Sequence, residues 1–453
     1  MSELQHLPSV EKILQTESAI ALSEAYGRPL TLRAVRLTLD TLRRRLISDP
    51  KAAAPAVDSI LDDTEQLLKE WTKIAYGPVI NATGVILHTN LGRAPVSRAT
   101  AAAMAEAALG YSNLEFDLGS GKRGQRGPGV EEVIRQITGA PAAMVVNNNA
   151  AAVLLILTAL AARKKVAIAR SQLVEIGGGF RMPDVMRQSG ARLVEVGTTN
   201  KVRLSDYEEA FPETGVMVRA HRSNFKMVGF TEEPPFETVV AAAHRAGQIV
   251  VDDLGSGALL DTARFGLEHE PMVQESLAAG ADVVCFSGDK LVGGPQGGII
   301  AGTAEIVAKI SKHPLARAVR ADKATLAGMG ATLMHFLRNE AEKEVPVWRM
   351  IALSPDELKQ RAAGWAVAVR RGVVRKNEST LGGGSLPGDS LPTYVLSLDI
   401  AKTEEFLLKL RSLNTPIIGR VEEGQVLLDP RTVQPDEDDA LTSGLRSALA
   451  EML

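Results

Sequence analysis

A single lysine stands where a buried strand would deliver it into a glycine-rich turn. Residues 282–286, DVVCF, are a β-branched and aromatic run, which predicts a buried strand of an α/β sheet. SGDK at 287–290 follows, and then five glycines by position 302. Burial lowers the pKa of an amine, and glycines let backbone approach a flat ligand. The pattern favours Lys290 as a Schiff-base lysine; the alternative is a solvated lysine at a strand end.

Two carboxylates end another predicted strand, in QIVVDDLGSG at 248–257. A carboxylate in this place can hold a pyridinium nitrogen protonated, which strengthens pyridoxal phosphate as an electron sink. Asp252 and Asp253 alternate between the two faces of a strand, so at most one should point to such a ring. The alternative is a helix cap or a solvated turn acid.

A strand, a turn and a helix follow one another at residues 142–162. Residues 142–146 predict the strand, Asn147, Asn148 and Asn149 the turn, and Ala150 onward a helix. The first N–H groups of such a helix suit a phosphate group; the alternative is an ordinary capped helix. Along the chain, the predicted phosphate-binding turn comes first, the two carboxylates second and Lys290 third. This order favours a site for pyridoxal phosphate.

Arginines gather in two places. Arg317 and Arg320 are three residues apart, which predicts one shared helix face suited to an oxyanion, or else an ordinary surface helix. A predicted N-terminal helix carries the second group: Arg33, Arg36, Arg43, Arg44 and Arg45. That group favours either RNA contact or a solvated helix face.

Composition limits the class of protein. The 453 residues suffice for two or three domains, and the net charge of −3 with pI 6.2 excludes a global basic field for nucleic acid. Cys285 is the only cysteine, which excludes a disulfide framework and a cysteine-based metal site. The polar N-terminus lacks a signal-peptide pattern, and the apolar run 150–162 is too short to cross a membrane. We therefore expect a cytoplasmic protein.

Periodicity predicts three domains. Residues 1–76 read as a helical domain, with Ser9 as a first cap and a third helix at about 57–75. Residues 77–340 alternate strands and helices, which predicts a parallel sheet covered on both faces, and 341–453 predict a smaller α/β domain. The string GSGKRG at 119–124 matches a dinucleotide-binding pattern, but a poor strand precedes it, so we reject that interpretation.

Together these residues resemble the bacterial selenocysteine synthases, the L-seryl-tRNA(Sec) selenium transferases. The matching stretches run from position 80 to past 420, and they are INATGVILHTNLGRAP, VVNNNAAAVLL, LVEIGGGFRMPDVM, HRSNFKMVGFTEE, DLGSG, FSGDKLVGGPQGGII, RAVRADK, GGGSLPGDSLPT and TPIIGRVEEGQ. The predicted helical domain at residues 1–76 also fits that family's N-terminal domain. At position 172 the resemblance leads us to expect an acidic residue, but the sequence has Gln172 there.

The resemblance implies a fold-type I pyridoxal-phosphate enzyme and assigns roles to residues. Lys290 would be the Schiff-base lysine, Asp253 would pair with the ring nitrogen, and Asp289 would be a catalytic-site residue. Arg93, Arg317 and Arg320 would bind the phosphate of the selenium donor. The expected cofactor-binding set is Lys290, Asp253, Asn148, Asn149, Ala150 and Ser287, and the expected tRNA-binding set is Arg33, Arg36, Arg43 and Arg44.

The implied reaction converts L-seryl-tRNA(Sec) to L-selenocysteinyl-tRNA(Sec). β-Elimination would give an aminoacrylyl-tRNA, to which selenium from selenophosphate adds. The family forms ring-shaped homodecamers, so we expect a homo-oligomer. Two alternatives are a pyridoxal-phosphate lyase for a small amino acid or amino-sugar phosphate, and a tRNA-binding protein without activity. The first would not need the N-terminal arginines, and the second would be expected to have lost Lys290 or its glycines.

Overall fold

The protein is described from a computed structural model, which describes residues 3–49, 51–72, 76–124 and 126–452. The chain divides into two compact units, Met1–Pro78 and Val79–Leu453. The predicted boundary at 340 between two further domains stays a prediction.

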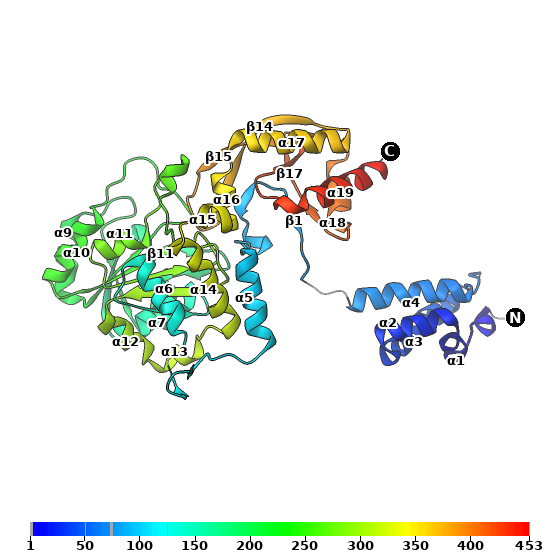
Figure 1. Cartoon of the computed structure of the whole chain (residues 1–453), viewed down its shortest axis with the longest axis horizontal. Coiled ribbons are helices and arrows are strands. Elements are labelled where there is room, and N and C mark those ends of the chain that lie inside the picture. The colour runs from blue at the N-terminus through cyan, green and yellow to red at the C-terminus, as the bar shows by residue number, and fades with distance from the viewer. Residues whose placement is uncertain (1–2, 50, 73–75, 125, 453) are drawn as a thin grey trace. The chain divides into compact units, whose positions relative to one another are not determined.

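The first unit consists of helices (Figure 1). They are η1 (Glu3–His6), α1 (Val10–Leu14), α2 (Glu17–Tyr26), α3 (Arg28–Ser48) and α4 (Val57–Thr72). Ser9 caps α1 as predicted, because its hydroxyl accepts a hydrogen bond from the Lys12 N–H at 3.3 Å. Apolar residues of α3 such as Leu39 pack on Ile13 and Ile60 to form the core. Residues 73–75 of the expected third helix lie outside the described residues.

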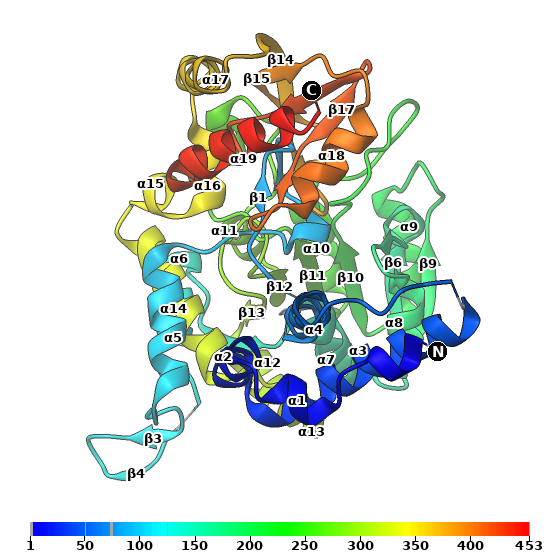
Figure 2. The same ribbon diagram turned by 90° about the vertical axis from the view of Figure 1, so that its right-hand side faces the viewer.

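A seven-stranded sheet organises the second unit, in the order β5-β13-β12-β11-β10-β6-β9 (Figure 2). The strands are β5 (Ala142–Val146), β6 (Lys165–Ala169), β9 (Arg192–Val196), β10 (Val216–Ala220), β11 (Ile249–Gly255), β12 (Val283–Ser287) and β13 (Gly298–Gly302). Every pairing is parallel except those of β13, which runs antiparallel to β12 and β5. The turn after β12 returns the chain directly, without a crossover helix, so β13 must be antiparallel.

Helices cover both faces of this sheet, as predicted. On β12, Val284 and Phe286 join one apolar cluster, and Val283 and Cys285 join the other. The first cluster includes residues of α6 (Pro128–Thr138), α9 (Leu204–Ala210), α10 (Phe236–Arg245), α11 (Val273–Ala278) and α14 (Lys323–Leu337). The second includes residues of α7 (Asn149–Ala161), α8 (Met182–Gln188), α12 (Ala304–Ser311) and α13 (Pro314–Ala318).

A five-stranded sheet lies in the C-terminal part, with the order β17-β18-β15-β14-β2. Its strands are β2 (Val85–Leu87), β14 (Val373–Gly382), β15 (Ser390–Leu398), β17 (Arg420–Glu422) and β18 (Gln425–Leu428), and its helices are α17 (Pro355–Val369), α18 (Thr403–Ser412) and α19 (Asp438–Ala450). β2 pairs with the end of β14, at Gly382 and Leu87. This pairing brings the segments that follow both strands together.

Short elements complete the second unit. They are β1 (Ile80–Asn81), η2 (Thr89–Leu91), α5 (Arg98–Leu109), β3 (Phe116–Asp117), β4 (Lys122–Arg123), η3 (Arg170–Gln172), β7 (Glu175–Ile176), β8 (Phe180–Arg181), η4 (Phe211–Glu213), η5 (Thr262–Phe265), α15 (Ala341–Glu344), α16 (Pro346–Ala352), β16 (Ile417–Ile418) and η6 (Pro435–Glu437). The string at 119–124 belongs to the β3–β4 hairpin, which projects beyond α5 (Figure 2), so its rejection as a dinucleotide-binding turn is confirmed. Within the described ranges, no helix combines the length and apolar character needed to cross a membrane.

Candidate active site

Lys290 lies in the turn after β12 and is 4% exposed. The Leu291 N–H donates to the Ser256 carbonyl at 3.0 Å, which ties this turn to the segment after β11. A Cβ on Gly384 would lie 2.6 Å from the Lys290 Nζ, and one on Gly255 would lie 3.7 Å from it. The amine therefore occupies a space that depends on the lack of a side chain at position 384.

Charge and burial favour a reactive amine. Burial lowers the pKa of Lys290, and the positive charge of Arg93 lowers it further. The carboxylates of Asp253, Asp289 and Glu270 raise it without reversing the shift. A lowered pKa increases the fraction of unprotonated, nucleophilic amine near neutral pH.

The side chains of Asp252 and Asp253 lie on different faces of β11. The Asp253 Oδ1 accepts a hydrogen bond from the Asn149 side-chain amide at 2.8 Å, and burial raises the pKa of its carboxyl. Asp252 is fully buried and accepts from the Arg219 Nε at 2.7 Å. Asp253 thus faces the start of α7, whereas Asp252 belongs to a buried ion pair.

The turn before α7 ends in the N-cap residue of that helix. The Asn148 side chain caps the helix by accepting from the Ala151 N–H at 2.8 Å. Asn149 is the first helical residue and reaches Asp253, while Ala150 follows it and is exposed. The first backbone N–H groups of a helix such as α7 can bind an anion.

Ser287 ends β12 beside this turn. Gly298 pairs with Ser287 on one side and with Val146 on the other, so β13 joins the two strand ends. A Cβ on Gly298 would lie 2.2 Å from the Asn148 carbonyl oxygen. The predicted phosphate turn, Ser287 and Lys290 are therefore parts of one edge of the sheet.

Arg93 meets Asp289, the neighbour of the lysine. Its guanidinium donates to the Asp289 Oδ2 at 2.8 Å, and the Ala94 N–H donates to the Asp289 backbone carbonyl at 3.3 Å. Arg93 has a φ of 64°, the left-handed region, which turns the chain sharply after η2. Arg93, which we expect to bind the selenium donor, is thus tied directly to the turn that carries Lys290.

Arg317 and Arg320 do not share a helix face, so that prediction was wrong. α13 ends at Ala318, and Arg320 forms an isolated antiparallel bridge with Val146. The Asn147 N–H donates to the Val319 carbonyl at 2.9 Å, so pairing with the end of β5 replaces the next helical turn.

Both arginines line one groove of about 600 Å³, which we call the arginine groove. Its lining also includes Arg126 and Glu131, and burial raises the pKa of Glu131 to about 7. In the described part of the chain, no hydrogen bond or ion pair links Arg317 or Arg320 to Lys290.

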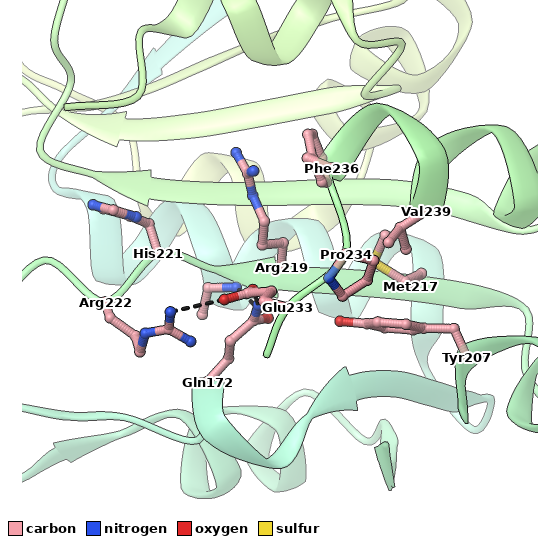
Figure 3. Close-up of a pocket in the computed structure, with 11 residues that line it drawn as sticks. Gln172, Tyr207, Met217, Arg219, His221, Arg222, Glu233, Pro234, Phe236 and Val239 are labelled. Atoms are coloured by element: carbon pink, nitrogen blue, oxygen red, sulfur yellow. Dashed lines mark hydrogen bonds and ion pairs between the residues drawn. The ribbon is translucent and has the colours of Figure 1, made fainter. Parts of the chain in front are cut away.

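A smaller pocket of about 170 Å³ adjoins the ends of β10 and η3 (Figure 3). Gln172 donates to the Glu233 Oε1 at 2.9 Å, and Arg222 donates to the Glu233 Oε2 at 2.7 Å. Glu233 therefore places a carboxylate beside Gln172, where the resemblance leads us to expect an acidic residue. The pocket's lining includes His221 but neither Lys290 nor Asp253.

Comparison with known families decides the chain's membership. A family model described as L-seryl-tRNA selenium transferase matches residues 79–434, and one described as selenocysteine synthase N terminal matches residues 4–43. The chain belongs to the L-seryl-tRNA selenium transferase family. Among its relatives, the L-seryl-tRNA(Sec) selenium transferase of Geotalea daltonii is 44% identical, over 98% of this chain and 99% of that one. The enzyme of the same name from Geobacter sulfurreducens is 43% identical, over the same shares of each chain.

A solved structure shares the fold of this family member. The structure of D-glucosaminate-6-phosphate ammonia-lyase covers 86% of this chain and 98% of its own, with a TM-score of 0.58 and 19% identity. Such a likeness concerns the fold alone, and with it the predicted fold-type I architecture is confirmed.

The N-terminal family match covers Arg33, Arg36 and Arg43. Together with Arg44, these arginines are exposed on α3. The Arg33 guanidinium lies 5.2 Å from the Trp71 ring centroid, and Arg43 pairs with Asp40 at 2.6 Å. Arg44 donates to the Asp40 carbonyl and the Thr41 hydroxyl, and among the described residues Arg43 is the one of these four arginines with a carboxylate partner.

Sequence reasoning missed Gly384 as a neighbour of the lysine. Gly384 lies in the matching stretch GGGSLPGDSLPT, whose three glycines signalled close backbone approach. The same reasoning also missed Glu270, which lies outside the matching stretches and whose carboxylate raises the pKa of Lys290.

Proposed function

We propose that this family member converts L-seryl-tRNA(Sec) to L-selenocysteinyl-tRNA(Sec), with pyridoxal 5′-phosphate as cofactor and selenophosphate as selenium donor. The observation that carries the proposal is the buried Lys290, whose pKa burial lowers, at the sheet edge that also holds Asp253 and the start of α7. The relatives named above supply the reaction.

The chain's own atoms fit the cofactor. The Asn149 Oδ1 and the Ser256 Oγ are buried and, among the described residues, without a hydrogen-bond partner. Asp253 is a buried carboxylate that would gain a partner in a protonated ring nitrogen. Lys290, Asp253, Asn148, Asn149, Ala150 and Ser287 would hold the group, with its phosphate at the N-terminus of α7.

Each residue has a role in the reaction. When bound, pyridoxal phosphate supplies an electron sink for negative charge at the seryl Cα. Lys290, with its lowered pKa, takes the proton from that Cα. Asp289 holds the Arg93 guanidinium next to the lysine. By resemblance, Arg93, Arg317 and Arg320 would bind the oxyanion of selenophosphate; Arg93 lies beside the lysine turn, whereas Arg317 and Arg320 line the arginine groove.

The N-terminal arginines would bind the tRNA, and the protein would work in the cytoplasm. A homo-oligomer, a decamer by resemblance, fits the exposed apolar side chains around the β3–β4 hairpin, because such patches mark contact surfaces. They include Leu109, Tyr111 and Leu118, whose side chains are all exposed.

Purified full-length protein and Lys290→Ala test the proposal, with the exposed Lys309→Ala as a matched control. We expect the visible absorbance of bound pyridoxal phosphate, and transfer of selenium from selenophosphate to seryl-tRNA(Sec), in the wild type and the control only. Cofactor binding without selenium transfer would favour the lyase alternative. Absence of cofactor binding in the wild type would overturn the proposal.

A further inference from the structure

Two side chains from different elements hold the same oxygen of Asp253. The Asn149 side-chain amide donates to the Asp253 Oδ1 at 2.8 Å, and the Cys285 thiol donates to the same oxygen at 3.7 Å. Asp253 on β11 and Cys285 on β12 are paired in register, so the thiol lies on the same face of the sheet as the carboxylate. Asn149 reaches that face from the first turn of α7. The Oδ1 is therefore fixed from two directions.

The second oxygen of this carboxylate is left without a partner. Among the described residues, no hydrogen bond or ion pair reaches the Asp253 Oδ2, although the residue is buried. A buried carboxylate is costly unless its oxygens are hydrogen-bonded. The arrangement thus satisfies one oxygen twice and leaves the other for a donor that the chain itself does not supply.

The two donors also favour the charged form of the carboxyl. Burial raises the pKa of Asp253, and the hydrogen bonds from Asn149 and Cys285 oppose that rise. Cys285 can act as a donor because burial raises the pKa of its thiol, which keeps the proton on the sulfur. An ionised Asp253 is the form that can hold a ring nitrogen protonated.

We propose that Asn149 and Cys285 are positioning residues that hold Asp253 by its Oδ1 and leave its Oδ2 for the ring nitrogen of pyridoxal phosphate. This inference rests on the proposed function, which supplies the cofactor. It gives Cys285 a role and adds one to that of Asn149, because both act through Asp253. The effect of removing either donor should therefore depend on the presence of the ring nitrogen.

The test compares pyridoxal 5′-phosphate with its carbocyclic analogue, in which a C–H group replaces the ring nitrogen. Calorimetric titration of cofactor-free, full-length protein gives the dissociation constant of each ligand. The wild type should prefer the natural cofactor at least roughly tenfold, because its ring nitrogen gains a charge-assisted hydrogen bond. Asn149→Ala should reduce this preference to less than roughly threefold, since the stronger donor is lost.

Cys285 is tested by two variants. Cys285→Ala should lower the preference by roughly threefold, because a thiol is a weak donor, and Cys285→Ser should retain it, because the hydroxyl still donates. Val283→Ala is the matched control, since Val283 is also fully buried on β12 and belongs to the same apolar cluster as Cys285. This control should keep the full preference even if it loses stability.

An unchanged preference in either Asn149→Ala or Cys285→Ala would overturn the inference, even with weaker binding of both ligands, because a purely structural role lowers both affinities alike. If Asn149→Ala fails to fold, the two variants of Cys285 decide alone. Equal affinity of the wild type for the two ligands would also overturn the inference. Wild-type protein that binds neither ligand would instead overturn the proposed function.

Discussion

Gly384 and Lys290 follow strands of different sheets, β14 and β12, yet a Cβ on Gly384 would lie 2.6 Å from the Lys290 Nζ. The segment after β14 therefore forms one wall around the amine. Gly384→Ala should displace the lysine and slow capture of pyridoxal phosphate at least roughly tenfold, as a misplacement of about 1 Å does at other reactive groups. Stopped-flow absorbance measures this rate.

Gly388→Ala is the matched control for that change. Gly388 also has a positive φ, 83° against 88° at Gly384, but nothing lies within 4 Å of its added Cβ. Both variants should lose about 1–2 kcal/mol of stability from the left-handed backbone. Only Gly384→Ala should lose capture, and equal capture rates in the two variants would contradict the contact.

Neutralising the two adjacent aspartates should have opposite effects on cofactor-free protein. Asp252→Asn leaves the Arg219 charge buried without its partner and should cost about 3–5 kcal/mol, measured by urea unfolding. Asp253→Asn should be neutral or stabilising, because burial penalises the charged carboxylate. Its new amide can also donate to the unpartnered Asn149 Oδ1.

The pH dependence follows from the sign of the shift. The folded-state pKa of Asp253 is raised, so its stabilising contribution is present below the unfolded pKa and is lost as pH rises through the folded value. The stability advantage of Asp253→Asn over the wild type should therefore grow with pH. An advantage that shrinks with rising pH would contradict a buried, uncompensated carboxylate.

Local patterns predicted the elements of the site, but not the contacts between distant segments. The run before Lys290 predicted β12 because β-branched residues suit a buried parallel strand. The two-residue alternation of β11 predicted that Asp252 and Asp253 point to different faces, but not which of them faces the start of α7. No local pattern indicated that β2 would pair with β14, which lies far away in the sequence. This pairing brings the segment of Gly384 to the lysine.

The error at Arg320 has a tertiary cause. Spacing predicted one helix through Arg317 and Arg320, and α13 does begin at Pro314. The backbone of Val319 and Arg320 instead pairs with the end of β5, because that strand end offered unpaired groups. Helical spacing is a local signal, and sheet pairing over long range overrode it.

Glu131 should make anion binding in the arginine groove depend on pH. Its pKa is raised to about 7 by burial, so the groove gains a negative charge as pH rises through that value. Affinity for sulfate, whose charge is constant in this range, should fall between pH 6 and 8, roughly three- to tenfold by calorimetry. Glu131→Gln should abolish this dependence. Glu132→Gln, at an exposed residue paired with Arg135, should retain it, and a pH-independent wild type would exclude the effect.

Replacing Arg36, Arg43 and Arg44 by alanine should weaken binding of seryl-tRNA(Sec) and leave the melting temperature nearly unchanged, because all three side chains are exposed on α3. Each lost phosphate contact should reduce the slope of log affinity against log salt by roughly 0.7–0.9. Filter binding over a salt series measures both quantities. The triple variant of Arg187, Arg203 and Arg338, exposed arginines of the second unit, removes the same charge and should bind normally. Equal weakening by both triple variants would show that net charge, rather than the surface of α3, governs tRNA binding.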